Sequence, residues 1–226
     1  MKSFNWLLVL SVLSCIGCSS PVHEDGRGCA FVSDSIQYRV EFMSAGCVRI
    51  LSFPEGDTLV TKRLVVDSEK PAFKDYKWED TGQKLLFRTR ELSVVFDKAD
   101  AAFIFQETST GKLLLKEKGD RKARNFKRSV AGGEQCLEVT QRFVPTEDEA
   151  IYGLGQYQNG IMNYRGKSVL LLQANMDIVN PFLISTNGYG VLWDNYSSTK
   201  FEDTKEGYSF TSEVGDASDY YFVYGK

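Results

Sequence analysis

Apolar and polar residues alternate with a period of two along most of the chain. The clearest case is residues 36–42, where four apolar side chains would share one strand face and Gln37, Arg39 and Glu41 the other. Such alternation is typical of a strand with one buried face. Further strands are predicted at 48–53, 59–66, 84–88, 92–96, 103–107, 113–116 and 137–143.

The spacing of these runs predicts an all-β fold. Gly, Pro, Asp or Ser residues separate them at short intervals, which leaves little room for the crossovers that parallel strands require. No segment sustains a helical period, so we expect little helix. With 226 residues, the chain is long enough for one large β-domain. We therefore predict a two-sheet antiparallel β-sandwich.

Two hairpin turns can be placed from sequence. Ser109-Thr110-Gly111 is predicted to join the runs at 103–107 and 113–116, because its glycine can adopt a positive φ. Asn187-Gly188 lies between two apolar runs and is the dipeptide that most favours a type I′ turn.

The N-terminus has the features of an export signal. Lys2 precedes an apolar run at 6–13 that is too short to span a bilayer, and small residues precede Cys18. Cys15-Ile16-Gly17-Cys18 resembles a bacterial lipoprotein cleavage box with Cys18 as the acylated residue, although Cys15 stands where leucine is usual. We expect export and a lipid anchor in the bacterial cell envelope, at the outer membrane or in the periplasm. The alternative is plain secretion.

The signal divides the chain into three parts. Residues 1–18 are predicted to be a lipoprotein-type signal peptide, residues 19–28 a flexible polar tether, and residues 29–226 the folded domain. In that domain Cys29 and Cys47 could form a disulfide bridge. The prediction that we favour is that they and Cys136 are small buried side chains.

Charge and composition exclude several functional classes. The net charge of −3 gives no field that favours nucleic acid, and the basic cluster 116–128 is interpreted as a solvated loop or hairpin edge. His23 is the only histidine and lies in the predicted tether, so no histidine-based triad or metal cluster is expected, and no cofactor. Gly153-Leu154-Gly155 lacks the third glycine of a phosphate-binding loop. Its glycines are better explained by close backbone approach at a bulge or domain contact.

Five short blocks occur in a characteristic order in the last third of the chain. They are Tyr152-Gly153-Leu154-Gly155, Arg165-Gly166, Asn175-Met176-Asp177, Pro181-Phe182 and Gly188-Tyr189-Gly190, and a final strand at 219–225 follows them. Together they resemble the N-terminal β-domain of glycoside hydrolase family 31, the α-glucosidase and α-xylosidase group. The resemblance is specific over 149–226 and architectural before that. It implies a galactose-mutarotase-like sandwich that precedes a catalytic (β/α)8 barrel.

The resemblance also implies roles for particular residues. Both catalytic aspartates of the family lie on barrel strands, so no catalytic residue is expected in this chain. Asp177, with Asn175 and Met176, would reach over the barrel mouth and bind sugar hydroxyls. From the residues alone, Asp177 could equally be a solvated loop carboxylate or a turn cap. Asp194 is expected on the turn side of a hairpin strand, and residues 220–222 are expected to pack against the barrel.

The sequence thus predicts a non-catalytic domain of an exported α-glycosidase. The blocks around Tyr152, Arg165 and Trp193 resemble the α-xylosidase branch, so α-linked xylosides such as those of xyloglucan fragments are the first expectation. The expected partners are this carbohydrate, the barrel of the same polypeptide, and the membrane only through the lipid. A free-standing surface carbohydrate-binding module without catalysis, with tyrosines as a stacking platform, is the main alternative. A non-functional remnant is another.

Overall fold

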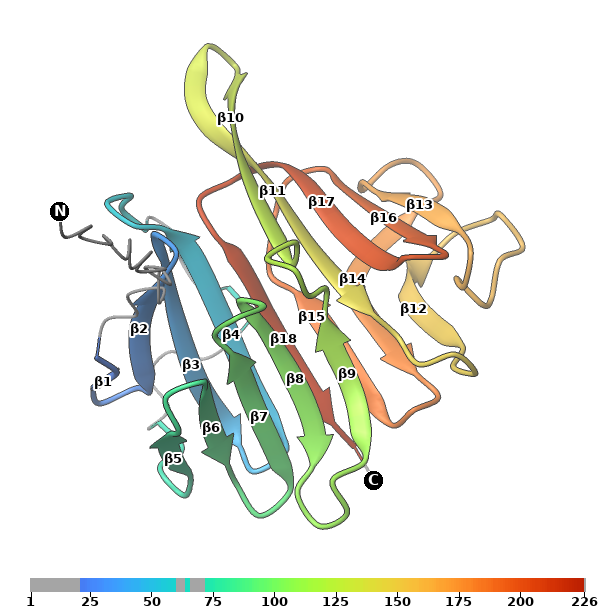
Figure 1. The fold of residues 1–226 in the computed structure, drawn as a ribbon. Coiled ribbons are helices and arrows are strands. Elements are labelled where there is room, and N and C mark those ends of the chain that lie inside the picture. The colour runs from blue at the N-terminus through green and yellow to red at the C-terminus, as the bar shows by residue number, and fades with distance from the viewer. Residues whose placement is uncertain (1–20, 60–63, 66–71, 226) are drawn as a thin grey trace, which may run out of the picture.

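The chain folds into two antiparallel β-sheets packed face to face. The computed structural model describes residues 21–59, 64–65 and 72–225, and Figure 1 shows the two layers. Within these ranges every regular element is a strand. The described segments accordingly include no helix long and apolar enough to cross a membrane. The prediction of an all-β, two-sheet antiparallel sandwich with little helix is confirmed.

The first sheet has eight strands in the order β1-β2-β3-β4-β18-β15-β14-β12. Their bounds are β1 His23–Glu24, β2 Cys29–Ser33, β3 Ile36–Ser44, β4 Cys47–Pro54, β18 Ser218–Tyr224, β15 Tyr189–Trp193, β14 Ile178–Ser185 and β12 Ile151–Gln156. Strand β18, late in the chain, lies between the early strand β4 and β15 (Figure 1). The two ends of the domain are therefore joined within one sheet.

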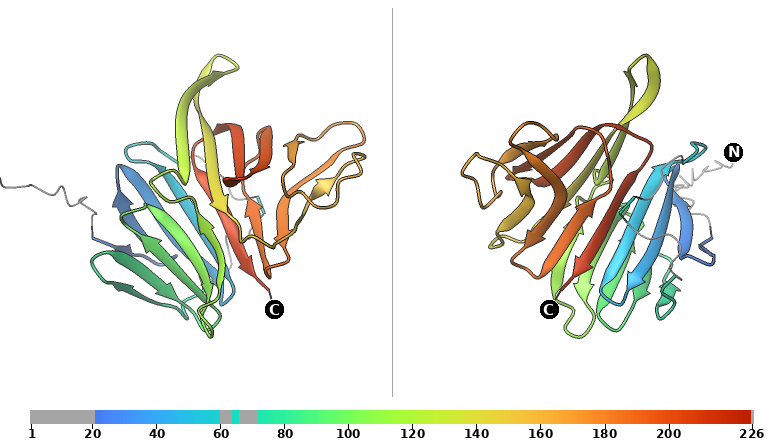
Figure 2. Two further views of the ribbon diagram at one scale, coloured as in Figure 1. Left: turned by 45° about the vertical axis from the view of Figure 1, so that its right-hand side comes forward. Right: turned by 180° about the vertical axis from the view of Figure 1, so that it is seen from behind.

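The second sheet has ten strands, nine of them in the order β13-β16-β17-β11-β9-β8-β7-β6-β5, while β10 pairs with β11. Their bounds are β13 Ser168–Leu171, β16 Thr199–Thr204, β17 Gly207–Gly215, β11 Glu134–Val144, β9 Leu113–Glu117, β8 Ala102–Glu107, β7 Leu92–Asp97, β6 Lys84–Arg88, β5 Lys77–Asp80 and β10 Arg124–Ala131. The hairpin of β10 and β11 projects beyond the sandwich (Figures 1 and 2).

Both predicted hairpins exist, but the second turn differs from its prediction. Residues 109–111 connect β8 and β9 as expected. The loop between β14 and β15 has three residues, because Ser185 pairs with Tyr189 and only Gly188 has a positive φ, 87°. A type I′ turn needs positive φ at both central residues, so that prediction is wrong. The Asn187 side chain instead donates to the Leu114 carbonyl, 2.7 Å away, and ties the turn to the other sheet.

Several strands differ from those predicted from the sequence. Of the predicted strand at 59–66, the described residues 59, 64 and 65 are not in a strand, and the others lie outside the described residues. Eight strands of the structure were not predicted: β1, β2, β5, β10, β12, β13, β16 and β17. In the segment 19–28, predicted to be a tether, His23–Glu24 form β1 and pair with β2. Ordered structure thus begins before Cys29, where the sequence placed the start of the domain.

The core between the sheets is rich in aromatic rings, and it includes residues expected elsewhere. Tyr220 and Phe222 are fully buried, and Tyr221 is 2% exposed. Phe222 stacks on Phe105 of the opposite sheet at 4.2 Å between ring centroids, and the Tyr220 hydroxyl donates to Glu117 at 2.9 Å. The prediction that residues 220–222 are exposed in this domain and pack against the barrel is therefore wrong. Residues 218–222 are all buried, so both faces of β18 are covered.

The remaining surface predictions can be compared with the structure. Cys29, Cys47 and Cys136 are free thiols, so Cys29 and Cys47 form no bridge, although only Cys29 is fully buried. Most side chains of the basic cluster 116–128 are solvated near the projecting hairpin. Arg124 is the exception, because its side chain is buried in an ion pair with Glu117.

Candidate functional site

The loop between β13 and β14 carries the three residues predicted to bind substrate. It turns back on itself at Ala174, whose carbonyl accepts a hydrogen bond from the Asp177 amide at 3.3 Å. Met176 has a φ of 72°, an uncommon conformation for a residue with a side chain. Gln173 braces the loop, since its side-chain oxygen accepts from the Val179 amide at 3.1 Å. Asn175, Met176 and Asp177 therefore share one short, locally hydrogen-bonded turn.

These three side chains are available to a ligand. Asn175 and Met176 are exposed, Met176 by 61%, while Asp177 is half-buried. The Asp177 carboxylate accepts no hydrogen bond from any described residue. Burial raises the pKa of the nearby Tyr157 to about 12, and Tyr164 and Asp177 add smaller contributions. An unengaged carboxylate of this kind can accept two charge-assisted hydrogen bonds from neighbouring hydroxyls.

The base of this loop is fixed by a bulge in β12. The register of β12 against β14 shifts between Gly153 and Gly155, and Leu154 between them is buried with a φ of 65°. A Cβ atom at Gly155 would lie 2.1 Å from the Ile178 carbonyl oxygen. The glycine is thus required for close backbone approach next to Asp177, as the sequence predicted for these glycines.

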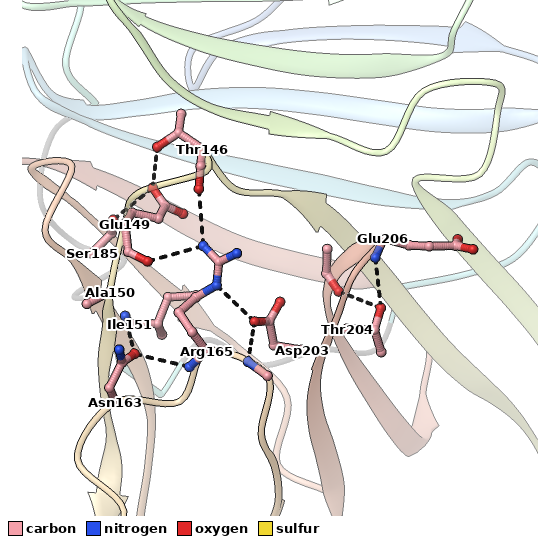
Figure 3. A network of polar contacts seen from close by, with 12 residues as sticks. Thr146, Glu149, Ala150, Ile151, Asn163, Arg165, Ser185, Asp203, Thr204 and Glu206 are labelled. Atoms are coloured by element: carbon pink, nitrogen blue, oxygen red, sulfur yellow. Dashed lines mark hydrogen bonds and ion pairs between the residues drawn. The ribbon is translucent and has the colours of Figure 1, made fainter.

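A second loop, residues 157–167, is held by Arg165 (Figure 3). The Arg165 Nε donates to Asp203 at 2.9 Å, and its Nη1 donates to the carbonyls of Thr146 and Glu149 at 3.1 and 3.2 Å. The Gly166 amide donates to the same Asp203 oxygen at 2.6 Å. The Arg-Gly block therefore anchors the loop beside β12 and has a structural role in this domain.

Glu149, at the entry to β12, is a buried acceptor for three hydroxyl groups. Tyr189, Ser185 and Thr146 donate to its carboxylate at 2.8, 3.0 and 3.2 Å (Figure 3 draws the latter two). Burial raises the pKa of Glu149, and these hydrogen bonds and the nearby Arg165 oppose that rise. The network joins the start of β12 to the end of β14 and the start of β15, at the end of these strands opposite the loop that carries Asp177.

The outer face of the first sheet contains a buried ion pair that the sequence did not reveal. Arg49 of β4 donates to both carboxylate oxygens of Asp219 on β18, with Nε to Oδ1 at 2.7 Å, and to Glu41 of β3 at 3.1 Å. Burial raises the pKa of Asp219 to about 6, against the lowering by Arg49. Burial lowers the pKa of Arg49, but its hydrogen bonds to Asp219 more than reverse this, so the guanidinium stays charged.

The prediction for Asp194 is also wrong. It follows β15 directly, as expected, but it is only 5% exposed and does not lie on a solvated turn. Its amide donates to the Asp219 carbonyl at 2.9 Å, so the chain continues the pairing of β15 with β18 at this point. Neither of its carboxylate oxygens accepts a hydrogen bond. No sequence signal distinguishes such a residue from a turn aspartate, because its burial comes from other strands.

Comparison with known proteins assigns the family. Residues 37–202 match the family model described as the glycosyl hydrolase 31 N-terminal galactose mutarotase-like domain. The match covers well over half of the chain. The chain belongs to this family.

Curated relatives of this glycosyl hydrolase 31 domain include an α-xylosidase of Saccharolobus solfataricus, 32% identical over 206 residues. The alignment spans 84% of the chain and 26% of that protein. A family 31 glucosidase of Pseudescherichia vulneris, whose activity is uncharacterised, is 35% identical over 45% of the chain and 19% of the relative. The chain thus corresponds to about a quarter or less of these relatives.

Solved structures agree on the fold of the glycosyl hydrolase 31 domain. A soil-metagenome α-xylosidase, solved with xylose, matches with a TM-score of 0.74 and 24% identity over 92% of the chain and 32% of that protein. The α-xylosidase of Xanthomonas citri matches at 30% identity with a TM-score of 0.68, over 81% of the chain and 20% of that protein. A dextranase of Flavobacterium johnsoniae matches with a TM-score of 0.72 and 21% identity, over 93% of the chain and 26% of that protein.

Proposed function

We propose that this domain is the N-terminal, non-catalytic part of an α-xylosidase that acts on α-linked oligosaccharides such as xyloglucan fragments. In this proposal the Asp177 loop completes the substrate pocket of a catalytic barrel in the same polypeptide. The observation that carries the proposal is the unengaged, half-buried Asp177 carboxylate on a loop whose base is fixed by the bulge in β12. The α-xylosidases among the relatives support the choice of substrate class.

The proposal is tested in the chain joined to its natural C-terminal continuation. Asp177→Ala is expected to lower kcat/KM for an aryl α-xyloside about 10- to 100-fold, since one carboxylate contact to hydroxyls contributes about 1.5–3 kcal/mol. Asp148→Ala, at an exposed carboxylate, is the control and should leave kcat/KM unchanged. Full activity of Asp177→Ala would contradict the role of the loop.

The free-standing binding module is distinguished by the chain alone. That alternative predicts saturable binding of xyloglucan fragments to the 226-residue chain, weakened when exposed tyrosines such as Tyr196, which is 55% exposed, become alanine. The α-xylosidase proposal expects no saturable binding, because the loop alone offers a single carboxylate and little stacking surface. Isothermal titration calorimetry measures the difference.

We also propose that the protein is exported and anchored in the bacterial envelope by a lipid on Cys18, which lies outside the described residues. Cys18→Ala is expected to abolish incorporation of a labelled fatty acid and to release the protein from the membrane fraction, because a thiol is the acylated group. Cys136→Ala, within the folded domain, should keep the label. A wild-type protein without label would support plain secretion.

A further inference from the structure

Asp194 is a buried carboxylate without a counter-charge in the described part of the chain. Its side chain is almost completely covered, and neither oxygen has a donor in hydrogen-bond geometry. The Tyr196 hydroxyl lies close by, since burial and then Asp194 raise the pKa of Tyr196 to about 12, but a hydroxyl supplies no counter-charge. Leaving an ionised carboxylate in this state is costly unless a cation or strong donors satisfy it. The position therefore needs a partner that the described residues do not supply.

The buried guanidinium of Arg49, which pairs with the neighbouring Asp219, is already engaged. Arg49 uses its Nε and Nη2 for Asp219 and its Nη1 for Glu41. Asp194 lies close enough to Asp219 to add, after burial, to the rise in the pKa of Asp219. Glu41 is also paired with Arg39, whose Nε lies 3.8 Å from its Oε1. Among the described groups, Glu41 and Asp219 therefore each have a guanidinium partner, and Asp194 has none.

Asp194 lines a pocket of about 380 Å³ at the end of β15. Its lining includes the apolar side chains of Leu172, Pro181 and Leu192 and several hydroxyl-bearing side chains. The rim is exposed and hydrophobic, with Leu172 exposed by 47% and Tyr196 by 55%. Leu172 also belongs to the loop that carries Asp177, so the pocket adjoins the proposed contact with the catalytic barrel.

We propose that this pocket receives an arginine or lysine side chain from the catalytic barrel of the same polypeptide, which forms an ion pair with Asp194 at the domain interface. This inference rests on the proposed function. The apolar walls suit the methylene stem of such a side chain, and a guanidinium can donate to both free oxygens. The hydrophobic rim around the pocket is of the kind that contacts protein.

Two other occupants fit the pocket less well. A sugar could donate hydroxyl hydrogen bonds, but it is neutral and would leave the negative charge of Asp194 uncompensated. A divalent cation such as Ca²⁺ takes six to eight oxygen ligands, including several carboxylates or carbonyls. The described residues contain no group of three or more His, Cys, Asp or Glu placed to hold a metal. A single basic side chain fits both the negative charge of an ionised Asp194 and the apolar lining of the pocket.

The test compares Asp194→Asn in two contexts. In the 226-residue chain, where the proposed partner is absent, the substitution removes an unpaired buried charge and should raise Tm by about 2–4 °C. In the chain joined to its natural C-terminal continuation, it removes the ion pair and should speed proteolysis at the domain boundary roughly tenfold. Asp148→Asn, at an exposed carboxylate, should change neither quantity.

Three results would overturn the inference. A lower Tm for Asp194→Asn in the chain alone would mean that the chain itself satisfies Asp194, for example through Lys62 or Arg63, which lie outside the described residues. Unchanged proteolysis in the joined polypeptide would mean that no interface contact is lost. Xylose that raises the Tm of the wild-type chain but not of Asp194→Asn would assign the pocket to a sugar.

The inference and the proposed function can fail separately. If Asp194→Asn stabilises the chain alone and speeds proteolysis of the joined polypeptide, but that polypeptide hydrolyses no α-xyloside, the ion pair is supported and the proposed function is wrong. If it hydrolyses α-xylosides in an Asp177-dependent way but Asp194→Asn has no effect on proteolysis, the function stands and the ion pair is wrong.

Discussion

Asp219→Ala is expected to destabilise the domain by about 3–5 kcal/mol, because removing one member of a buried ion pair leaves the other charge uncompensated. Arg49 is 4% exposed in its side chain and depends on Asp219 for two of its hydrogen bonds. Glu41 would remain its single described carboxylate partner. Urea unfolding at neutral pH measures the change in the free energy of unfolding.

Asp219→Asn and Asp148→Ala provide the controls for this prediction. The amide oxygen of Asp219→Asn can still accept one hydrogen bond from Arg49. The free energy of unfolding of this variant should therefore lie between those of wild type and Asp219→Ala. Asp148 is exposed and forms no described ion pair, so its substitution should change stability by less than about 0.5 kcal/mol. A loss below about 1 kcal/mol for Asp219→Ala would show that the buried pair contributes little.

Gly155→Ala is expected to cost about 3 kcal/mol. Gly155 has a φ of 121°, a region that is accessible essentially to glycine alone. The new methyl group would also meet the Ile178 carbonyl oxygen at 2.1 Å, and this obstacle is backbone that cannot rotate away. Strand β14 must therefore move at the residue that follows Asp177, so the substitution should affect the loop as well as stability.

The effect of Gly155→Ala is read in two measurements. Thermal unfolding of the chain should show a clearly lower Tm, and kcat/KM of the joined polypeptide should fall even though Gly155 does not reach a substrate. Gly26→Ala is the matched control, because open space surrounds that glycine and its φ is not positive. Wild-type stability of Gly155→Ala would mean that the bulge can relax without penalty.

The sequence was sufficient for the fold where local pattern and tertiary burial agree. Alternation over 36–42 correctly placed β3, since its apolar residues face the core. The final strand was expected, but its packing was not: both faces of β18 are buried within this domain, whereas residues 220–222 were expected to pack against the barrel. The type I′ turn failed because Asn187 forms hydrogen bonds to the opposite sheet, which no local propensity encodes.

The candidate site was predicted to a similar extent. The loop residues 175–177 are together and accessible, because a turn keeps sequence neighbours close. Arg49, Glu41 and Asp219 come from three strands and meet only through the sheet register, so the sequence pattern placed Glu41 on the polar face of its strand and indicated no role for Arg49 and Asp219. Asp194 was missed for the same reason. Registers between distant strands are not visible in one sequence without knowledge of which strands pair.

The central position of β18 has a consequence for how the protein is made. Arg49 and Asp219 are separated by 170 residues in the chain, yet they lie on neighbouring strands. On the ribosome, β4 emerges long before β18, the strand that joins it to β15, so the backbone edge of β4 stays open until almost the whole domain has been made. Closure of the first sheet is therefore a late step in biogenesis, and a nascent chain halted before residue 218 would expose this unpaired edge to chaperones.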